Sequence, residues 1–406
     1  MNKIGINLER EFWLLLLPLM FIPSASIGQA TAFGTLEVSD FLIVPFIVTL
    51  LLYRKTTLRH PYEKSFIHFS MLFIIWALLG ISLIMIKYNY PNGIAVAASS
   101  VLKLAKFTLF GAAGVMVWKK VNSRSVLTKL HYTILVCGLI VALSLIFQQG
   151  TSDVLSEVDQ KVFKSLNMMS VTLGMIITYT LALVIARLET KTWTRFATVA
   201  LLIMLVGFAI SRGRGGWFAS IAGLSYFFIK QGKRASTIIV VLVALSAPIY
   251  LYQKFPAFRR DVMTTFNISA ESQRNIEKDV VDSGHRVETW INEAGKFFNN
   301  PLTGTGYFHR GYLSKLWATG SHNYWLQMFL ETGLIGGLLT FIIFSRLWLM
   351  TTADNVRKSG FNVPLQAVLI TAFIGGLSGE YFYGGLALIT LLLLFSSANI
   401  FPRDSQ

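Results

Sequence analysis

The chain has 406 residues, of which 54% are apolar and only 14% are charged. About a quarter of the residues of a soluble domain are charged, so this composition excludes a water-soluble globule, and also a disordered chain or a small disulfide scaffold. The mean hydropathy of +0.58 points to a polytopic helical membrane protein.

Apolar segments of membrane-helix length recur along the chain. Since a helix needs about 20 residues to span a bilayer, we predict an all-α bundle of about twelve transmembrane helices. We place them near residues 11–33, 36–53, 66–86, 94–118, 131–147, 166–186, 196–210, 217–229, 235–252, 322–345, 362–379 and 382–398. The single cysteine, Cys137, falls inside one of these segments and is expected to be a small core residue.

The spans and loops divide the chain into three parts. Residues 1–252 form an N-terminal transmembrane bundle of about nine helices, and residues 321–406 form about three more. Residues 253–320 lie between them as one long loop. Loops of this length between spans are usually functional, so we interpret it as a lid over a site in the membrane region.

The basic residues set the expected topology. A net charge of +16 would suggest nucleic-acid binding in a soluble protein, but here the basic residues gather in alternate loops, such as 54–64, 119–130 and the segment from Arg346 to Lys358. Basic loops usually face the cytoplasm. We therefore expect both termini in the cytoplasm, the 253–320 loop on the opposite side, contact with membrane lipids, and no nucleic-acid partner.

One outward connection breaks this charge rule. Residues 211–216, Ser-Arg-Gly-Arg-Gly-Gly, place Arg212 and Arg214 in a predicted tight turn. Guanidinium groups match phosphate or carboxylate oxygens, which favours an anion site over an arginine pair that only contacts lipid headgroups. A third outward arginine, Arg286, is a weaker candidate, and the alternative is a surface salt bridge with Glu288 or Asp282.

A polar stripe begins the tenth predicted span. His322 stands at the membrane boundary, where a neutral imidazole accepts a proton near neutral pH. Asn323, Gln327 and Glu331 follow at spacings of four, which predicts one polar helix face. This face favours a functional histidine over a helix cap or a headgroup contact.

Three further residues are weaker candidates. Lys103 and Lys106 lie one helical turn apart inside the predicted span 94–118, where they would contact a lipid phosphate or form an internal polar pair with Asp40. Glu380 lies in an outward turn and would orient His322 or bind a ligand. We expect no metal site, because there is no Asp-x-Asp and the outward histidines lack ligand spacing.

The segment 321–337 carries a recognisable signature. His322-Asn323 is followed, after nine residues, by Gly333 and Gly336. This pattern resembles the signature of the O-antigen ligase and polymerase superfamily of bacterial envelope glycosyltransferases, which is His-(Asn/Ser/Gln), nine residues, then Gly-x-x-Gly.

Two other motifs are similar to the same family. They are Ser-Arg-Gly at 211–213, and Gly-His-Arg at 284–286 ahead of Pro-Leu-x-Gly-x-Gly at 301–306. Hydropathy is similar over nearly the whole chain, whereas the matching motifs lie between residues 211 and 337.

The resemblance implies a lipid-donor glycosyltransferase in the bacterial inner (cytoplasmic) membrane, with its active site facing the periplasm and no cofactor. The donor would be a glycan on undecaprenyl diphosphate. Carried over by position, Arg212 and Arg286 would hold the diphosphate and His322 would assist the acceptor hydroxyl, with inversion at the anomeric carbon. Arg214 has no family counterpart, so its role as a substrate ligand rests on the charge argument alone. Arg212, Arg286 and His322 are expected to line one outward cavity.

The acceptor stays open at this point. A ligase would use the lipid A core of lipopolysaccharide, a polymerase the next lipid-linked repeat unit, and a third member type a protein serine or threonine. Polymerases often carry two large outward loops and only one is evident here, which slightly favours a ligase. A polysaccharide or lipid transporter is the alternative from another class, and it would predict a midplane site and two related halves.

Overall fold

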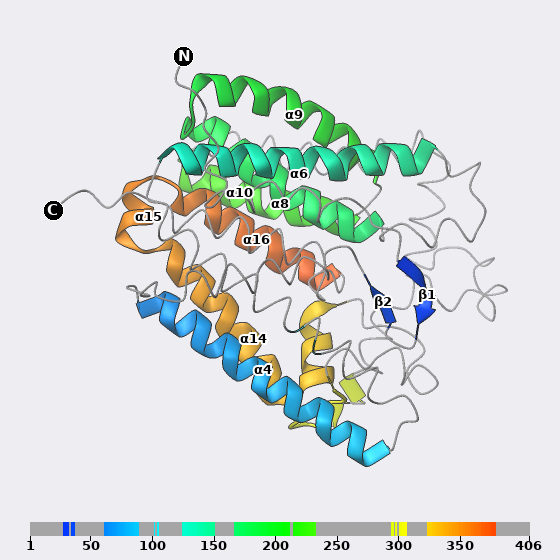
Figure 1. The fold of residues 1–406 in the computed structure, drawn as a ribbon. Helices are drawn as coiled ribbons and strands as arrows, with labels where there is room; N and C mark the ends of the chain where they lie inside the picture. Colours follow the sequence, from blue (N-terminus) through cyan, green and yellow to red (C-terminus); the bar gives the residue numbers. More distant parts are fainter. Residues whose placement is uncertain are drawn as a thin grey trace, which may run out of the picture.

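The computed structural model consists mainly of helices in the part of the chain that it describes. That part comprises residues 27–31, 34–36, 61–88, 101, 104, 124–150, 166–211, 214–232, 294–295, 297–298, 300–306 and 323–378. The helices, drawn in Figure 1, are α4 (Pro61–Tyr88), α6 (Arg124–Gly150), α8 (Leu166–Ala186), α9 (Lys191–Ile210), α10 (Arg214–Lys230), α14 (Tyr324–Thr351), α15 (Asp354–Lys358) and α16 (Asn362–Ser378).

Most of these helices coincide with predicted spans. The prediction at 166–186 matches α8 at both ends, those for α10 and α16 differ by at most three residues, and those for α4, α6, α9 and α14 miss one end by five to seven residues. Within the described residues, α4, α6, α8, α9 and α14 are long and apolar enough to cross a membrane. The predicted helical class is thereby confirmed for these segments. The other predicted spans lie mainly outside the described residues, so the total of about twelve stays a prediction.

A short hairpin corrects the first predicted span. Strands β1 (Ile27–Thr31) and β2 (Gly34–Leu36) are antiparallel, with Thr31 opposite Gly34. The predicted helix over 11–33 is therefore wrong at its C-terminal end. Gly28 and Gln29 interrupt the apolar run there, and glycine disfavours a helix by about 1 kcal/mol relative to alanine.

Helix α14 extends further than predicted. We expected its span to end at residue 345, with Arg346 in a basic loop, but the helix continues to Thr351. The guanidinium carbon of Arg346 lies 5.3 Å from the ring centroid of Phe69 on α4. A cation over an aromatic face is stabilised electrostatically, which explains how an arginine is accommodated within the helix.

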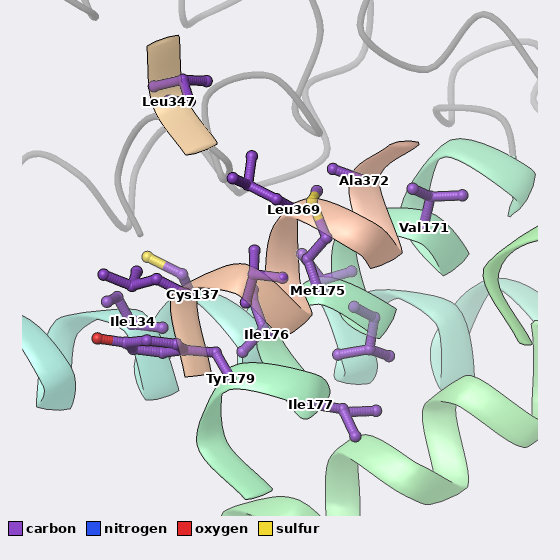
Figure 2. Close-up of a cluster of buried hydrophobic side chains, with 14 of the residues drawn as sticks. Ile134, Cys137, Val171, Met175, Ile176, Ile177, Tyr179, Leu347, Leu369 and Ala372 are labelled. Carbon is purple, nitrogen blue, oxygen red and sulfur yellow. The ribbon is translucent and has the colours of Figure 1, made fainter. Parts of the chain in front are cut away.

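Helix α8 is the centre of the bundle. Every residue from Met169 to Thr180 is buried, and α8 packs against α6, α9, α10 and α16. Figure 2 shows Met175 and Tyr179 of α8 among side chains of α6 and α16, with Cys137 in the same core. Cys137 is fully buried, which confirms its predicted role as a core residue.

The outer helices keep apolar faces exposed. Helix α4 packs along α14 at one side of the bundle, and α9 covers α6 and α8 at the other (Figure 1). Both expose large apolar side chains, among them Ile75 and Leu79 on α4 and Val199 and Leu202 on α9. In a protein with membrane-spanning helices, such faces contact lipid.

The bundle has two distinct ends. At the first, which we call the basic end, Glu189 in the α8–α9 connection contacts His131 near the start of α6, and Phe361 before α16 stacks on the same imidazole. At the second, which we call the site end, the starts of α8, α10 and α14 meet the end of α16. From α6 through α8 and α9 to α10, consecutive described helices run in opposite directions, as the charge pattern predicts for neighbouring spans. Which end faces the cytoplasm stays a prediction.

Candidate functional site

The arginine turn lies at the site end. Helix α9 ends at Ile210, and the buried Ser211 caps it, donating its amide to the carbonyl of Gly207 at 3.0 Å. The Ser211 hydroxyl and the Trp217 indole N–H both donate to the carbonyl of Phe208, at 2.6 and 3.0 Å. The two helices that flank the turn are therefore tied to one carbonyl group.

The turn is shorter than predicted. Helix α10 begins at Arg214, so Gly215 and Gly216 are helical rather than part of a loop. A Cβ atom on Gly216 would collide with the backbone carbonyl and the hydroxyl of Ser170 on α8. Gly216 therefore permits a close helix–helix contact and is not part of the predicted 211–216 turn.

The start of α14 rests on the end of α16. Trp325 donates its indole N–H to the carbonyl of Phe373 at 3.1 Å. A Cβ on Gly376 would lie 2.9 Å from that indole nitrogen, and a Cβ on Gly375 would lie 2.8 Å from Val171 of α8. A continuous series of contacts therefore leads from the arginine turn through α8 and α16 to the helix that follows His322.

Asn323 caps this helix. Its Oδ1 accepts the amides of Trp325 at 3.0 Å and Leu326 at 3.2 Å, and the residue is 8% exposed. Asparagine and serine are among the best N-cap residues. Helix capping therefore explains why the signature has these residue types directly after its histidine. The side chain of Asn323 thus has a structural role, and its predicted contact with substrate stays a prediction.

The predicted polar face is present on the first part of α14. The side-chain amide of Gln327 donates to a carboxylate oxygen of Glu331, and the two residues are only 4% and 2% exposed. Burying a carboxylate is unfavourable unless hydrogen bonds compensate it, and in membrane proteins such groups commonly mark functional regions. Both side chains therefore belong to the candidate site.

The signature glycine Gly333 breaks α14. Its φ of 67° and ψ of −171° are not helical, so α14 consists of two helical segments that meet at this residue. Figure 1 shows these segments running in different directions, with the shorter one towards the site end. We call residues 323–332 the short arm and residues 334–351 the long arm.

The second motif, Pro-Leu-Thr-Gly-Thr-Gly at 301–306, docks on this break. The amides of Thr305 and Gly306 donate to the carbonyls of Leu330 and Glu331 at 3.0 and 2.9 Å. The amide of Leu334 donates in turn to the carbonyl of Pro301 at 2.7 Å. The loop thereby replaces hydrogen bonds that a continuous helix would make within itself.

Glycines make this docking possible. Gly304 and Gly306 have φ of +67° and +93°, a region that other residues rarely adopt. A Cβ on Gly333 would collide with Leu302, and a Cβ on Gly304 would lie 2.5 Å from the carbonyl oxygen of Glu331. The 301–306 motif and the Gly333 motif, which are separate in the sequence, therefore pack directly against each other.

Several predicted side chains cannot be placed. Asn323 is described in full, and the backbone of Arg214 is the first residue of α10. The other predicted site residues lie outside the described residues: Arg212, Arg286, His322, Lys103, Lys106 and Glu380. Ser211 and Asn323, which adjoin Arg212 and His322, and Ser378, two positions before Glu380, lie on elements that meet at the site end.

A second polar cluster at the basic end had not been predicted. His131 Nδ1 lies 2.7 Å from Glu189 Oε1, and Nε2 lies 3.0 Å from the hydroxyl of Tyr179. Thr128 donates to the other oxygen of Glu189 at 3.0 Å. The contact joins residues 58 positions apart, so no local pattern reveals it. Because it lies at the opposite end, we assign it to stability rather than to the site.

Membrane-length apolar helices, with a buried polar arm at one end of the bundle, define a polytopic helical membrane protein. A sequence model of the O-antigen ligase family matches residues 199–341, from within α9 to the long arm of α14. The match supports the resemblance to the O-antigen ligase and polymerase superfamily that the motifs indicated. No curated protein matches the sequence significantly. The family match points to a ligase- or polymerase-type membrane glycosyltransferase that acts on lipid-linked glycans.

Proposed function

We propose that this protein transfers a glycan from undecaprenyl diphosphate to an acceptor hydroxyl on the periplasmic side of the inner membrane. The observation that carries the proposal is the meeting of two motif-bearing elements at the site end. Helix α10, which begins two residues after Arg212, and the helix that follows His322 both pack on the same ends of α8 and α16. This arrangement supports a shared site for a phosphate ligand and a proton acceptor.

The arginines would act on the leaving group. Transfer breaks the bond between the anomeric carbon and the diphosphate oxygen, which leaves negative charge on that oxygen. Guanidinium groups held in place stabilise this charge more in the transition state than in the ground state. Arg212 and Arg286 would hold the diphosphate, with Arg214 as a further phosphate ligand. Lys103 and Lys106 are additional candidates for the same anion.

His322 would act on the acceptor. The acceptor oxygen forms the new bond to the anomeric carbon from the face opposite the diphosphate, which inverts that centre. The hydroxyl proton passes to the His322 imidazole, either directly or after the histidine has oriented the hydroxyl. The short arm, which follows this histidine in the chain, is buried and hydrogen-bonded at the site end, and this would restrict the position of the histidine. Glu380 would orient the imidazole or bind sugar.

A polymerase differs only in its acceptor, a second lipid-linked repeat unit instead of the lipid A core. The family match covers both activities. We favour the ligase because the sequence predicts one large outward loop, whereas polymerases often carry two. An assay with separate acceptors decides between them.

The transporter alternative has one feature in its favour, the broken helix α14. In transporters, unwound backbone carbonyls at a helix break coordinate the transported ion or substrate. Here the carbonyls of Leu330, Glu331 and Thr332 accept hydrogen bonds from Thr305, Gly306 and Trp76. These carbonyls are engaged by protein groups, which favours a structural break over a transport site.

A reconstituted transfer reaction tests the proposal. Purified protein is incubated with an undecaprenyl-diphosphate-linked glycan and, in separate tubes, lipid A core, a second lipid-linked unit, or a serine-containing peptide. We expect a product mass equal to glycan plus lipid A core, with an inverted anomeric configuration by NMR. Product only with the second lipid-linked unit would identify a polymerase. Absence of product in every tube, with folded protein and intact donor, would contradict the glycosyltransferase proposal.

A further inference from the structure

The break in α14 leaves the short arm without the usual support of a continuous helix. In a regular helix, the amide of Leu334 would donate to the carbonyl of Leu330. Here that amide donates to Pro301 instead, and Leu330 accepts from Thr305. The direction of the short arm is therefore set by groups outside α14 rather than by the helix itself.

Trp76 on α4 supplies one of these groups. Its indole Nε1–H donates to the carbonyl of Thr332 at 2.8 Å, across 256 positions of sequence. Thr332 is the last residue before the break at Gly333. This hydrogen bond therefore connects the end of the short arm to a helix that packs along the long arm.

The second signature glycine accommodates Trp76. A Cβ on Gly336 would lie 3.2 Å from Cδ1 of the Trp76 indole and would collide with the side chain of Thr332. The Gly-x-x-Gly spacing thus has two separate physical functions. Gly333 makes the break. Gly336 leaves room for Trp76, which donates a hydrogen bond to the carbonyl of Thr332 just before the break.

The 301–306 loop also rests on α4. A Cβ on Gly80, one helical turn after Trp76, would lie 3.2 Å from the carbonyl oxygen of Thr303. The loop therefore lies between α4 and the short arm and contacts both. We call Trp76 together with residues 301–306 the arm clamp.

We propose that the arm clamp fixes the orientation of the short arm, and that Trp76 is a positioning residue for the histidine at its start. The effect on transfer rests on the proposed function, in which His322 receives the acceptor proton. His322 directly precedes the Asn323 cap of the short arm, so a tilt of the arm displaces it. A small displacement of a proton acceptor lowers the rate of the chemical step more than it lowers donor binding.

The test compares two tryptophans. Trp76→Phe removes the hydrogen-bonding N–H and keeps an aromatic ring. Trp193→Phe is the matched control, because the indole nitrogen of Trp193 is buried without a hydrogen-bond partner among the described residues, on α9 near the basic end. Transfer kinetics are measured on purified protein with the lipid-diphosphate donor. We expect W76F to lower kcat about tenfold with a donor KM within about twofold of wild type, and W193F to change neither.

A distance measurement gives a readout that needs no activity. Cys137 is the single cysteine, so Cys137→Ala gives a cysteine-free background. Spin labels are then attached at Leu326→Cys on the short arm and at Ser345→Cys on the long arm. We expect a single narrow distance distribution in this background and with W193F, and a broadened one with W76F. Gly336→Ala is a second variant, which keeps the indole N–H of Trp76 but crowds its ring, and we expect the same broadening. Gly295→Ala is its control, because the described residues leave open space around the position of its Cβ.

The two readouts separate the two proposals. Broadening in W76F and G336A together with a loss of kcat supports the arm clamp. An unchanged distribution in both folded variants overturns it, whatever the enzyme assay shows. Broadening without any change in kcat overturns the positioning role of Trp76. If the wild-type protein transfers no glycan, the proposed function fails, and the distance distributions alone decide whether the clamp holds the arm.

Discussion

The backbone of Leu302 occupies the space that a Cβ atom on Gly333 would need. Since Gly333 also has a φ of 67° and a ψ of −171°, two independent constraints require glycine at this position. One is the conformation of its own backbone, and the other is the approach of a loop from an earlier part of the chain. The signature glycine is therefore explained by packing and conformation, without any contact to substrate.

Gly333→Ala should destabilise the protein. The strained backbone and the collision with Leu302 together should cost about 3 kcal/mol, which a thermal melt in detergent measures as a lower Tm. Gly295→Ala is the control, because no atom of the described residues lies within 4 Å of the position that its Cβ would take. Equal Tm values for the two variants would show that the break at Gly333 does not constrain the fold.

The buried pair on the short arm gives a second prediction. Gln327→Leu removes the amide that donates to Glu331 and leaves a buried carboxylate with one hydrogen bond fewer. We expect a loss of about 2 kcal/mol in the free energy of unfolding. Gln327→Glu should lose more, because it places two carboxylates side by side. A Q327E protein as stable as wild type would argue against the buried contact.

Hydropathy and charge were sufficient to predict much of the fold. The boundaries of α8 follow directly from its apolar run, and those of α9 and α10 are close to the predicted ones. The polar face of Gln327 and Glu331 follows from helical spacing and is confirmed. These features depend on residues within one or two turns of each other, so the local sequence contains the information.

The break and its clamp were not predictable in the same way. Hydropathy averages over many residues, so a single glycine with positive φ inside an apolar helix leaves no signal. The Trp76–Thr332 hydrogen bond spans 256 positions, and the His131–Glu189 contact spans 58. The motif spacing indicated that Gly333 and Gly336 matter, but only the packed structure shows which atoms require them.

The cluster at the basic end gives a third prediction. Glu189→Gln removes the charge from a pair with His131 in which both side chains are fully buried, and we expect a loss of about 3 kcal/mol. Asp354→Asn is the control, since its ion pair with Arg357 is largely exposed and should leave Tm unchanged. Because the cluster lies away from the site end, kcat per folded E189Q molecule should equal that of wild type. A stable E189Q protein with reduced kcat would instead connect this cluster to the site.

The topology can be tested by chemical labelling. Leu302 is exposed beside the break in α14, and Thr192 is exposed at the basic end. If basic loops face the cytoplasm, a membrane-impermeant maleimide should label Leu302→Cys in cells with a permeabilised outer membrane. Thr192→Cys should react only after the inner membrane is also permeabilised. The parent protein is the control, because its one cysteine, Cys137, is buried. The reverse labelling pattern would place the site end in the cytoplasm and remove the periplasmic part of the proposal.

Arg212→Lys tests the electrostatic basis of catalysis. Lysine keeps the positive charge but loses the planar fork of donors that binds two phosphate oxygens at once. We expect transfer to fall about 100-fold while the amount of folded protein stays the same. Arg195→Lys, on the exposed face of α9 near the basic end, is the control and should transfer glycan at the wild-type rate. The measurement is the rate of product formation from the lipid-diphosphate donor, normalised to folded protein. Transfer by R212K within a factor of about two of wild type would mean that Arg212 makes no bidentate contact with the leaving diphosphate, because the loss of such a contact costs far more than that in rate.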